Sequence, residues 1–166
     1  ARCSGPNWGL ACNGIHFLDL VSWWTGERLI EIDSSELDTE WIETKRKGFF
    51  DITGKITAVF SEGSTLILEA RLDGPPISLE VDTQMGTWKI DELNGVASKS
   101  NGFLIPGKIE TQSSITSRLV DNLQKVGDCY LTKLSESVEL HRVLLRSLLG
   151  HWNYSHNTNT DTIPIT

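Results

Sequence analysis

The chain has 166 residues, enough for one domain with a single hydrophobic core. Its formal net charge of −7 at pH 7 excludes non-specific nucleic-acid binding, which needs a basic face. The one dense basic cluster, 45–47, is short enough to be a solvated strand end. No apolar run approaches the roughly 18 residues of a membrane span, and the first residues carry no signal-peptide pattern. We therefore expect neither nucleic acid nor membrane as a partner.

The cysteines are few and odd in number: Cys3, Cys12 and Cys129. Such a set suits a reduced compartment better than a disulfide framework, so we expect a cytoplasmic protein with free thiols. The chain opens with Ala1 in a stretch typical of the middle of a loop. We therefore expect a domain excised from a longer protein.

The first elements predicted are a loop and a helix. Residues 1–13 contain a Gly-Pro breaker at Gly5 and predict a loop. Residues 15–24 predict a helix that Gly26 caps, with one stripe formed by His16, Leu20, Trp23 and Trp24. His16 would then lie in the first turn, close to the positive end of the helix dipole.

The middle of the chain alternates apolar and polar residues with period two. This pattern predicts strands over 56–60, 66–72, 77–82 and around Trp88 and Ile90, preceded by strands over 28–32 and 41–44. Tight glycine-containing turns between the later strands imply an antiparallel meander. One face of that sheet would be packed and the other more polar.

Helical periodicity returns near the end of the chain. One helix, ending at Gly127, is predicted by the stripe Ile115, Leu119, Leu123 and Val126. A second, with Thr132 or Ser135 as its cap, is predicted by the stripe Leu134, Val138, His141, Leu145 and Leu148. The polar tail 153–162 predicts a loop. A helix, then a sheet, then two helices is the order typical of an α+β fold.

The residues suited to chemistry lie between Trp8 and His16. A histidine at a helix start can stay neutral and act as a base toward a substrate hydroxyl, although it can also merely cap or pack. Cys12, one helical turn earlier, has the spacing of a nucleophile with His16 as its base, or of a zinc ligand pair that lacks its other two ligands. Trp8 is the aromatic residue best placed to line a sugar pocket, and Asn13 can supply a polar contact.

A known family has a similar segment. The run Cys12-Asn13-Gly14-Ile15-His16-Phe17-Leu18-Asp19-Leu20 resembles the Asp-x-Gly-x-His-x-x-Asp-Leu segment of the glucose-fructose oxidoreductase / inositol dehydrogenase / rhizopine-catabolism (Gfo/Idh/MocA) family. The strand pair around Gly63, the strand 86–90 and the helix 134–142 are also similar to that family's C-terminal domain. The resemblance thus covers nearly the whole chain. It departs from the pattern at Cys12, where the family has an aspartate.

The resemblance implies an NAD- or NADP-dependent dehydrogenase of a sugar, amino sugar, nucleotide sugar or polyol. A preceding Rossmann domain would hold the cofactor and a catalytic lysine, and residues 1–166 would form a single substrate and oligomerisation domain. The implied fold is an open-faced, predominantly antiparallel sheet with helices packed on one face, like the C-terminal domain of dihydrodipicolinate reductase. His16 and Cys12 would occupy catalytic positions, and Trp8 and Asn13 would contact the substrate. The sheet face would form a homo-oligomer, a dimer or a tetramer.

The dinucleotide-binding motif is missing from the chain. That motif needs Gly-x-Gly-x-x-Gly between a strand and a helix, and no two glycines here are separated by a single residue. We therefore expect the chain alone to bind NAD weakly at most and to be inactive. A thiol cannot replace an orienting carboxylate, so two alternatives stay open. One is a non-catalytic binding or assembly module of the same fold, and the other is an unrelated small enzyme that uses Cys12 and His16.

Overall fold

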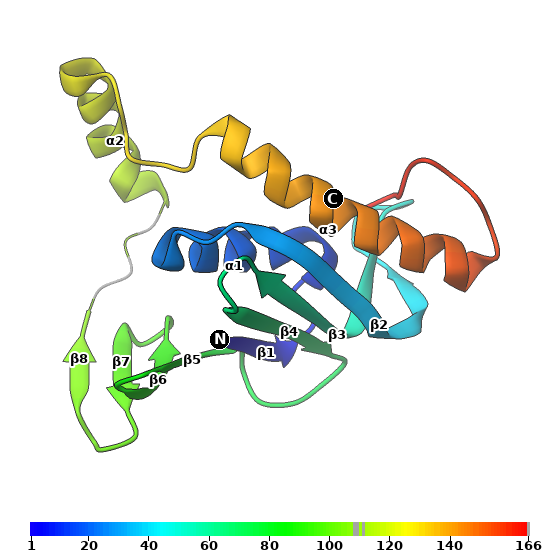
Figure 1. Cartoon of the computed structure of the whole chain (residues 1–166), viewed down its shortest axis with the longest axis horizontal. Helices are drawn as coiled ribbons and strands as arrows, with labels where there is room; N and C mark the ends of the chain where they lie inside the picture. Colours follow the sequence, from blue (N-terminus) through cyan, green and yellow to red (C-terminus); the bar gives the residue numbers. More distant parts are fainter. Residues whose placement is uncertain (108–109, 111, 166) are drawn as a thin grey trace.

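The computed structural model describes residues 1–107, 110 and 112–165 (Figure 1). Within them the chain forms, in order, β1 (Arg2–Pro6), α1 (Leu10–Thr25), β2 (Leu29–Glu43), β3 (Phe50–Phe60), β4 (Thr65–Arg71), β5 (Ser78–Thr83), β6 (Gly86–Asp91), β7 (Val96–Lys99), β8 (Leu104–Pro106), α2 (Gln112–Val126) and α3 (Leu134–His156). No helix in these ranges is long and apolar enough to cross a membrane. The fold is α+β, as the order of predicted elements indicates.

The strands form one sheet in the order β2-β3-β4-β1-β5-β6-β7-β8. The predicted β3–β4 and β5–β6 pairs are antiparallel neighbours, and among the described strands only the β1–β4 pair is parallel. β1 lies between β4 and β5, with Cys3 opposite Leu68 on one side and Leu79 on the other. The expected meander is therefore interrupted, because the first strand of the chain separates its two halves.

The prediction of a loop over residues 1–13 is wrong. Gly5 and Pro6 act as turn breakers in isolation, but here they complete β1 between two partner strands. A Cβ atom on Gly5 would lie 2.7 Å from the Cα of Ile77, so a glycine is needed where the chain enters β5. In the folded chain Gly5 is therefore a strand residue that lets β1 approach the start of β5 closely.

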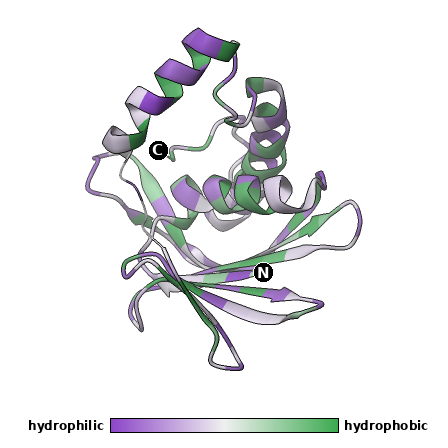
Figure 2. Ribbon diagram, turned by 90° about the vertical axis from the view of Figure 1, so that its left-hand side faces the viewer, coloured by the Kyte–Doolittle hydropathy of each residue, from purple (hydrophilic) through white to green (hydrophobic). Residues whose placement is uncertain are grey.

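The helices α1 and α3 lie on the same face of the sheet, and the opposite face is open (Figure 2). α1 packs on β3 and β4, α3 packs on β2, and the two helices also contact each other. Leu18 of α1, Ile56 of β3 and Leu68 of β4 are fully buried between these layers. Burying one such side chain contributes roughly 1.5–3 kcal/mol. This apolar layer therefore holds α1 in place.

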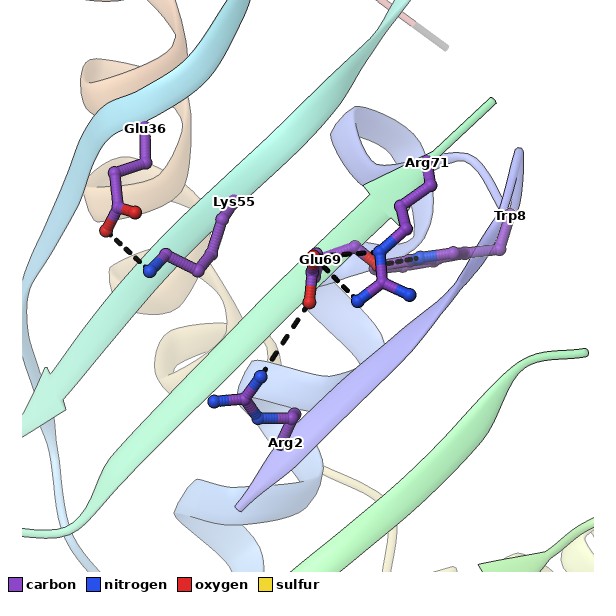
Figure 3. A network of polar contacts seen from close by, with 6 residues as sticks. All are labelled: Arg2, Trp8, Glu36, Lys55, Glu69 and Arg71. Carbon is purple, nitrogen blue, oxygen red and sulfur yellow. Dashed lines mark hydrogen bonds and ion pairs between the residues drawn. The ribbon is translucent and has the colours of Figure 1, made fainter. Parts of the chain in front are cut away.

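The open face of the sheet is polar, as the alternation predicts. Glu69 of β4 accepts a hydrogen bond from Arg71 Nε at 2.9 Å and lies 3.8 Å from Arg2 of β1 (Figure 3). Beside them Lys55 of β3 pairs with Glu36 of β2 at 2.6 Å (Figure 3). These pairs are partly solvated and so contribute little to stability. This side of the sheet is therefore a charged face, and neither α1 nor α3 covers it.

α1 begins at Leu10, earlier than the predicted Ile15, and it buries a different stripe. The buried residues are Leu10, Ala11, Gly14, Leu18 and Val21. Of the predicted stripe, Trp23 is 71% exposed and Trp24 is exposed as well, so neither tryptophan belongs to the core. Both stripes have helical spacing, but only the one with small residues lets the helix lie close to the sheet. Gly26 caps the helix in the left-handed conformation, with φ 73°, as predicted.

The strand pattern is more extensive than the prediction. The segments 28–32 and 41–44 are parts of one strand, β2, whose register against β3 shifts three times. β7 and β8 were not predicted, because both are short and β8 is exposed throughout. The alternation with period two is interrupted in β2 because its register shifts and because β2 lies at an edge of the sheet.

The last two helices match the prediction in place but not in every detail. α2 ends at Val126, directly before Gly127, as predicted. α3 begins after Lys133, whose backbone N–H donates to the Glu136 carboxylate at 3.1 Å, so neither Thr132 nor Ser135 is the cap. The buried residues of α3 are Leu140, Leu144 and Leu148, and His141 is exposed instead of packed. α3 also extends to His156, into the stretch predicted as a loop.

Candidate functional site

The predicted site residues lie in the first half of α1 and in the turn before it. That turn passes through Gly9, in the left-handed conformation with φ 81°, and the Gly9 carbonyl accepts the first helical hydrogen bond, from Asn13, at 2.6 Å. The backbone N–H of Ala11 donates to Asp51 Oδ1 at 2.8 Å. A carboxylate from the start of β3 therefore does what a side chain at the N-cap usually does: it satisfies an orphan donor at the positive end of the helix.

Trp8 and Asn13 hold this turn together. The Trp8 Nε1–H donates to the Glu69 carbonyl at 2.9 Å (Figure 3), and its ring meets Phe17 edge-on with centroids 5.4 Å apart. The Asn13 Nδ2 donates to the Trp8 carbonyl at 2.7 Å. Both side chains are half-buried. Their printed contacts are thus internal and fix the shape of the helix entry.

Cys12 and His16 have a different environment. They are one turn apart on the outward side of α1, and both are exposed. Neither side chain has a hydrogen-bond partner among the described residues. His16 lies in the second turn, since the helix begins at Leu10, so its predicted place in the first turn is wrong. The imidazole is instead available to whatever meets this face.

These four residues do not line either of the best-formed cavities of the described chain. The larger cavity, about 900 Å³, lies at the other end of α1, among the start of β2, the segment 128–133 and α3. The smaller, about 60 Å³, lies beside Phe17 and Cys3. In addition, no group of three or more His, Cys, Asp or Glu side chains in the described ranges is arranged to hold a metal ion. The face with Cys12 and His16 is therefore one wall of a site at most.

Two positioning residues escaped the sequence reasoning. Asp51 gave no signal, because a carboxylate at a strand start does not reveal a helix 40 residues away in the sequence. Gly14 matched the family segment, but its role became clear only in three dimensions. A Cβ atom on Gly14 would lie 3.3 Å from Leu68 Cδ1, so this glycine lets α1 approach β4 closely.

Asp19 and Cys3 take structural roles. The Thr132 hydroxyl donates to Asp19 Oδ2 at 2.8 Å, which ties α1 to the segment before α3. Cys3 is fully buried, and burial, together with the negative charge of Glu92, raises the pKa of its thiol to about 12. Cys3 is therefore a core residue without chemistry at neutral pH.

Comparison with known proteins gives a fold. No family model and no curated protein matches the chain. A protein of Thermotoga maritima provisionally assigned as an oxidoreductase aligns over 96% of this chain and 52% of its own, with 13% identity and a TM-score of 0.58. One of Bacteroides fragilis NCTC 9343, assigned in the same way, aligns over 98% and 55%, with 14% identity and a TM-score of 0.53. The chain shares its fold with about half of each protein.

The shared fold confirms the predicted architecture, an open-faced and mostly antiparallel sheet with helices on one side. The WlbA dehydrogenase from Bordetella pertussis, solved in complex with NADH and UDP-GlcNAcA, aligns over 99% of this chain and 54% of its own at 14% identity. Its TM-score of 0.41 is too low to argue from. The chain thus spans about half the length of the solved structures that it matches.

Proposed function

We propose that the chain is the substrate-binding and oligomerisation domain of an NAD(P)-dependent oxidoreductase of the Gfo/Idh/MocA family, acting on a sugar, a nucleotide sugar or a polyol. The observation that carries this proposal is the exposed pair Cys12 and His16, on a firmly held helix face that lines neither of the two cavities described above. A second domain would supply the opposite wall of the site. The segment resemblance and the fold shared with half of two proteins assigned as oxidoreductases support it.

In this proposal His16 binds a hydroxyl of the substrate and assists in accepting its proton. A neutral imidazole has one free acceptor nitrogen, which suits that role. The contacts of Asp51 and Gly14 fix α1 against the sheet, so the His16 imidazole would be held in a fixed position relative to the substrate. Cys12 would contact the same substrate through a thiol, where the family segment has the carboxylate of an aspartate.

The residues of this chain do not fit a dinucleotide, since no glycine-rich turn joins a strand to a helix here. NAD or NADP would be held by a preceding Rossmann domain, and no residue of this chain is assigned to it. The open face of the sheet, with Arg2, Glu69 and Arg71, would form the contacts between subunits. Those charges suit pairing with a second polar face better than burial against an apolar one.

The test uses the full-length protein with NAD or NADP and a panel of sugars, nucleotide sugars and polyols. His16→Ala should lower turnover about 10²–10⁴-fold, the usual contribution of a positioned acid–base group. His141→Ala is the matched control, because His141 is also an exposed helical histidine but lies on α3. An undiminished His16→Ala enzyme, or micromolar NAD binding by the isolated 166 residues, would contradict the proposal.

The second candidate is a non-catalytic binding or assembly module, and Cys12 in place of a carboxylate favours it. A full-length protein that binds the cofactor but turns over no substrate would support this candidate. Cys12→Asp then becomes informative, because turnover gained by this change would identify the missing carboxylate as the cause. The unrelated Cys–His enzyme has less support, because the best-formed cavities exclude both side chains.

A further inference from the structure

Helix α2 presents an apolar stripe that the rest of the chain leaves largely uncovered. The helix projects from the body of the molecule (Figure 1), and among the described residues it makes no extensive contact with the sheet or with α1 or α3. Its stripe consists of Ile115, Leu119, Leu123 and Val126, and the last two are 49% and 61% exposed. A helix of 15 residues is marginal in water on its own, so α2 requires a partner to be stable.

The larger cavity, about 900 Å³, is a groove whose apolar and acidic lining suits such a helix. Its walls include the apolar side chains of Trp23, Leu140 and Val143. Carboxylates outnumber cations among its lining residues; the acidic residues are Asp19, Glu27, Asp128, Glu136 and Glu139, and the basic ones are Arg28 and Lys133. The last turn of α1 also borders the groove and contains no basic residue, so its negative dipole end adds to the acidic character.

We propose that this groove receives α2 from a second copy of the chain, and that two copies exchange their helices around a two-fold axis, through a contact separate from the one proposed above for the open face of the sheet. The apolar stripe of α2 lies against Trp23 and its neighbours, while Arg118 and Lys125 meet the acidic rim. One chain thus carries both halves of a self-complementary contact, as a two-fold interface requires. Exchange also doubles the buried area, because each copy gives one helix and receives one.

The connection between helix and groove suits this exchange. α2 ends at Val126, and Asp128, two residues later, already lines the groove. The helix and the groove of one copy are therefore neighbours, and a two-fold axis beside them brings each helix to the partner's groove. Arg118 and Lys125 pair with Glu110 and Asp121 in the single chain, and these exposed pairs cost little to exchange.

The first test measures self-association of the chain by sedimentation equilibrium over a range of concentrations. Leu123→Asp places a charge in the apolar stripe and should weaken the helix-exchanged dimer at least tenfold, while association through the open sheet face should be unchanged. Gln124→Asp, the matched control on the polar side of the same helix, should leave the dimer unchanged. Neither variant should move the urea midpoint of the body, because α2 contributes little to it. A chain that stays monomeric at millimolar concentration, or equal association of both variants, overturns the proposal.

The second test changes the groove. Trp23→Ala should weaken the dimer at least tenfold, whereas Trp24→Ala, which removes a tryptophan outside the groove, should not. Mixing the Leu123→Asp and Trp23→Ala chains should give a mixed dimer tighter than either parent, because one helix-in-groove contact is then intact. If only the α2 variant weakens association, α2 pairs with another α2 and the proposal fails. The proposal also fails if the chain is a monomer and Trp23→Ala speeds hydrogen exchange of the α2 backbone amides. That result would show that α2 occupies the groove of its own chain.

Discussion

The carboxylate of Asp51 is expected to determine how firmly the first turn of α1, and with it the Cys12–His16 face, is held. Asp51→Ala removes the acceptor of the Ala11 N–H, a bond of 2.8 Å. Loss of an N-terminal cap costs about 0.5–2 kcal/mol. Ala11 is only 3% exposed, so water cannot easily replace the lost acceptor, and we expect about 1–2 kcal/mol. In a chain of this size each kcal/mol lowers Tm by about 2–4 °C.

The measurement is urea unfolding followed by circular dichroism, with Asp73→Ala as the control. Asp73 lies exposed in the turn after β4, and its removal should change stability by no more than about 0.5 kcal/mol. Asp51→Asn should fall between the two, because an amide oxygen still accepts the bond. If Asp51→Ala and Asp73→Ala unfold at the same urea concentration with the same slope, the tertiary cap is not a stabilising contact.

Further predictions concern the core, one buried carboxylate and the thiols. Leu68→Ala should cost about 2–5 kcal/mol in urea unfolding, because Leu68 is fully buried beneath α1; a loss below about 1 kcal/mol would contradict that packing. The Ser64 hydroxyl, followed by the backbone N–H groups of the β3–β4 turn, holds the pKa of Glu27 below its ordinary value of 4.5. The stability that this carboxylate contributes is therefore present above pH 4.5 and is lost as the pH falls through the lower pKa of the folded state. The urea midpoint of Glu27→Gln should consequently depend less on pH in that range than the midpoint of the unchanged chain. An equal pH dependence of the two midpoints would refute the assignment. With a thiol reagent at pH 8, Cys12 should react promptly and Cys3 only after unfolding; rapid labelling of Cys3 in the native chain would show that it is not buried.

Local sequence patterns correctly predicted the elements whose conformation depends little on distant segments of the chain. The alternation over β3 and β4 and the stripe of α2 were sufficient, because each element repeats one simple period over seven residues or more. Gly26 and Gly127 marked two helix ends correctly. The candidate site was proposed from the sequence alone, because the motif from Cys12 to Leu20 is contiguous, and its role stays a prediction.

Predictions failed where a distant segment decides the conformation. β1 contains Gly5 and Pro6 and forms a strand only because β4 and β5 flank it. The start of α1 depends on Asp51, and the buried stripe depends on which side meets β4. His16 therefore lies in the second turn of α1, whereas the sequence pattern had predicted the first.

By itself, the sequence determined the α+β class, the location of β3 to β6 and of the later helices, and the lack of a Gly-x-Gly-x-x-Gly motif. These follow from hydrophobic period and from glycine spacing, which are local properties. Only the tertiary structure decided that the Cys12–His16 face lines neither of the two cavities described above, that α2 stands apart from the body, and that an acidic groove lies beside it. The physical reason is that burial and closeness depend on contacts between segments far apart in the chain, which no local pattern encodes.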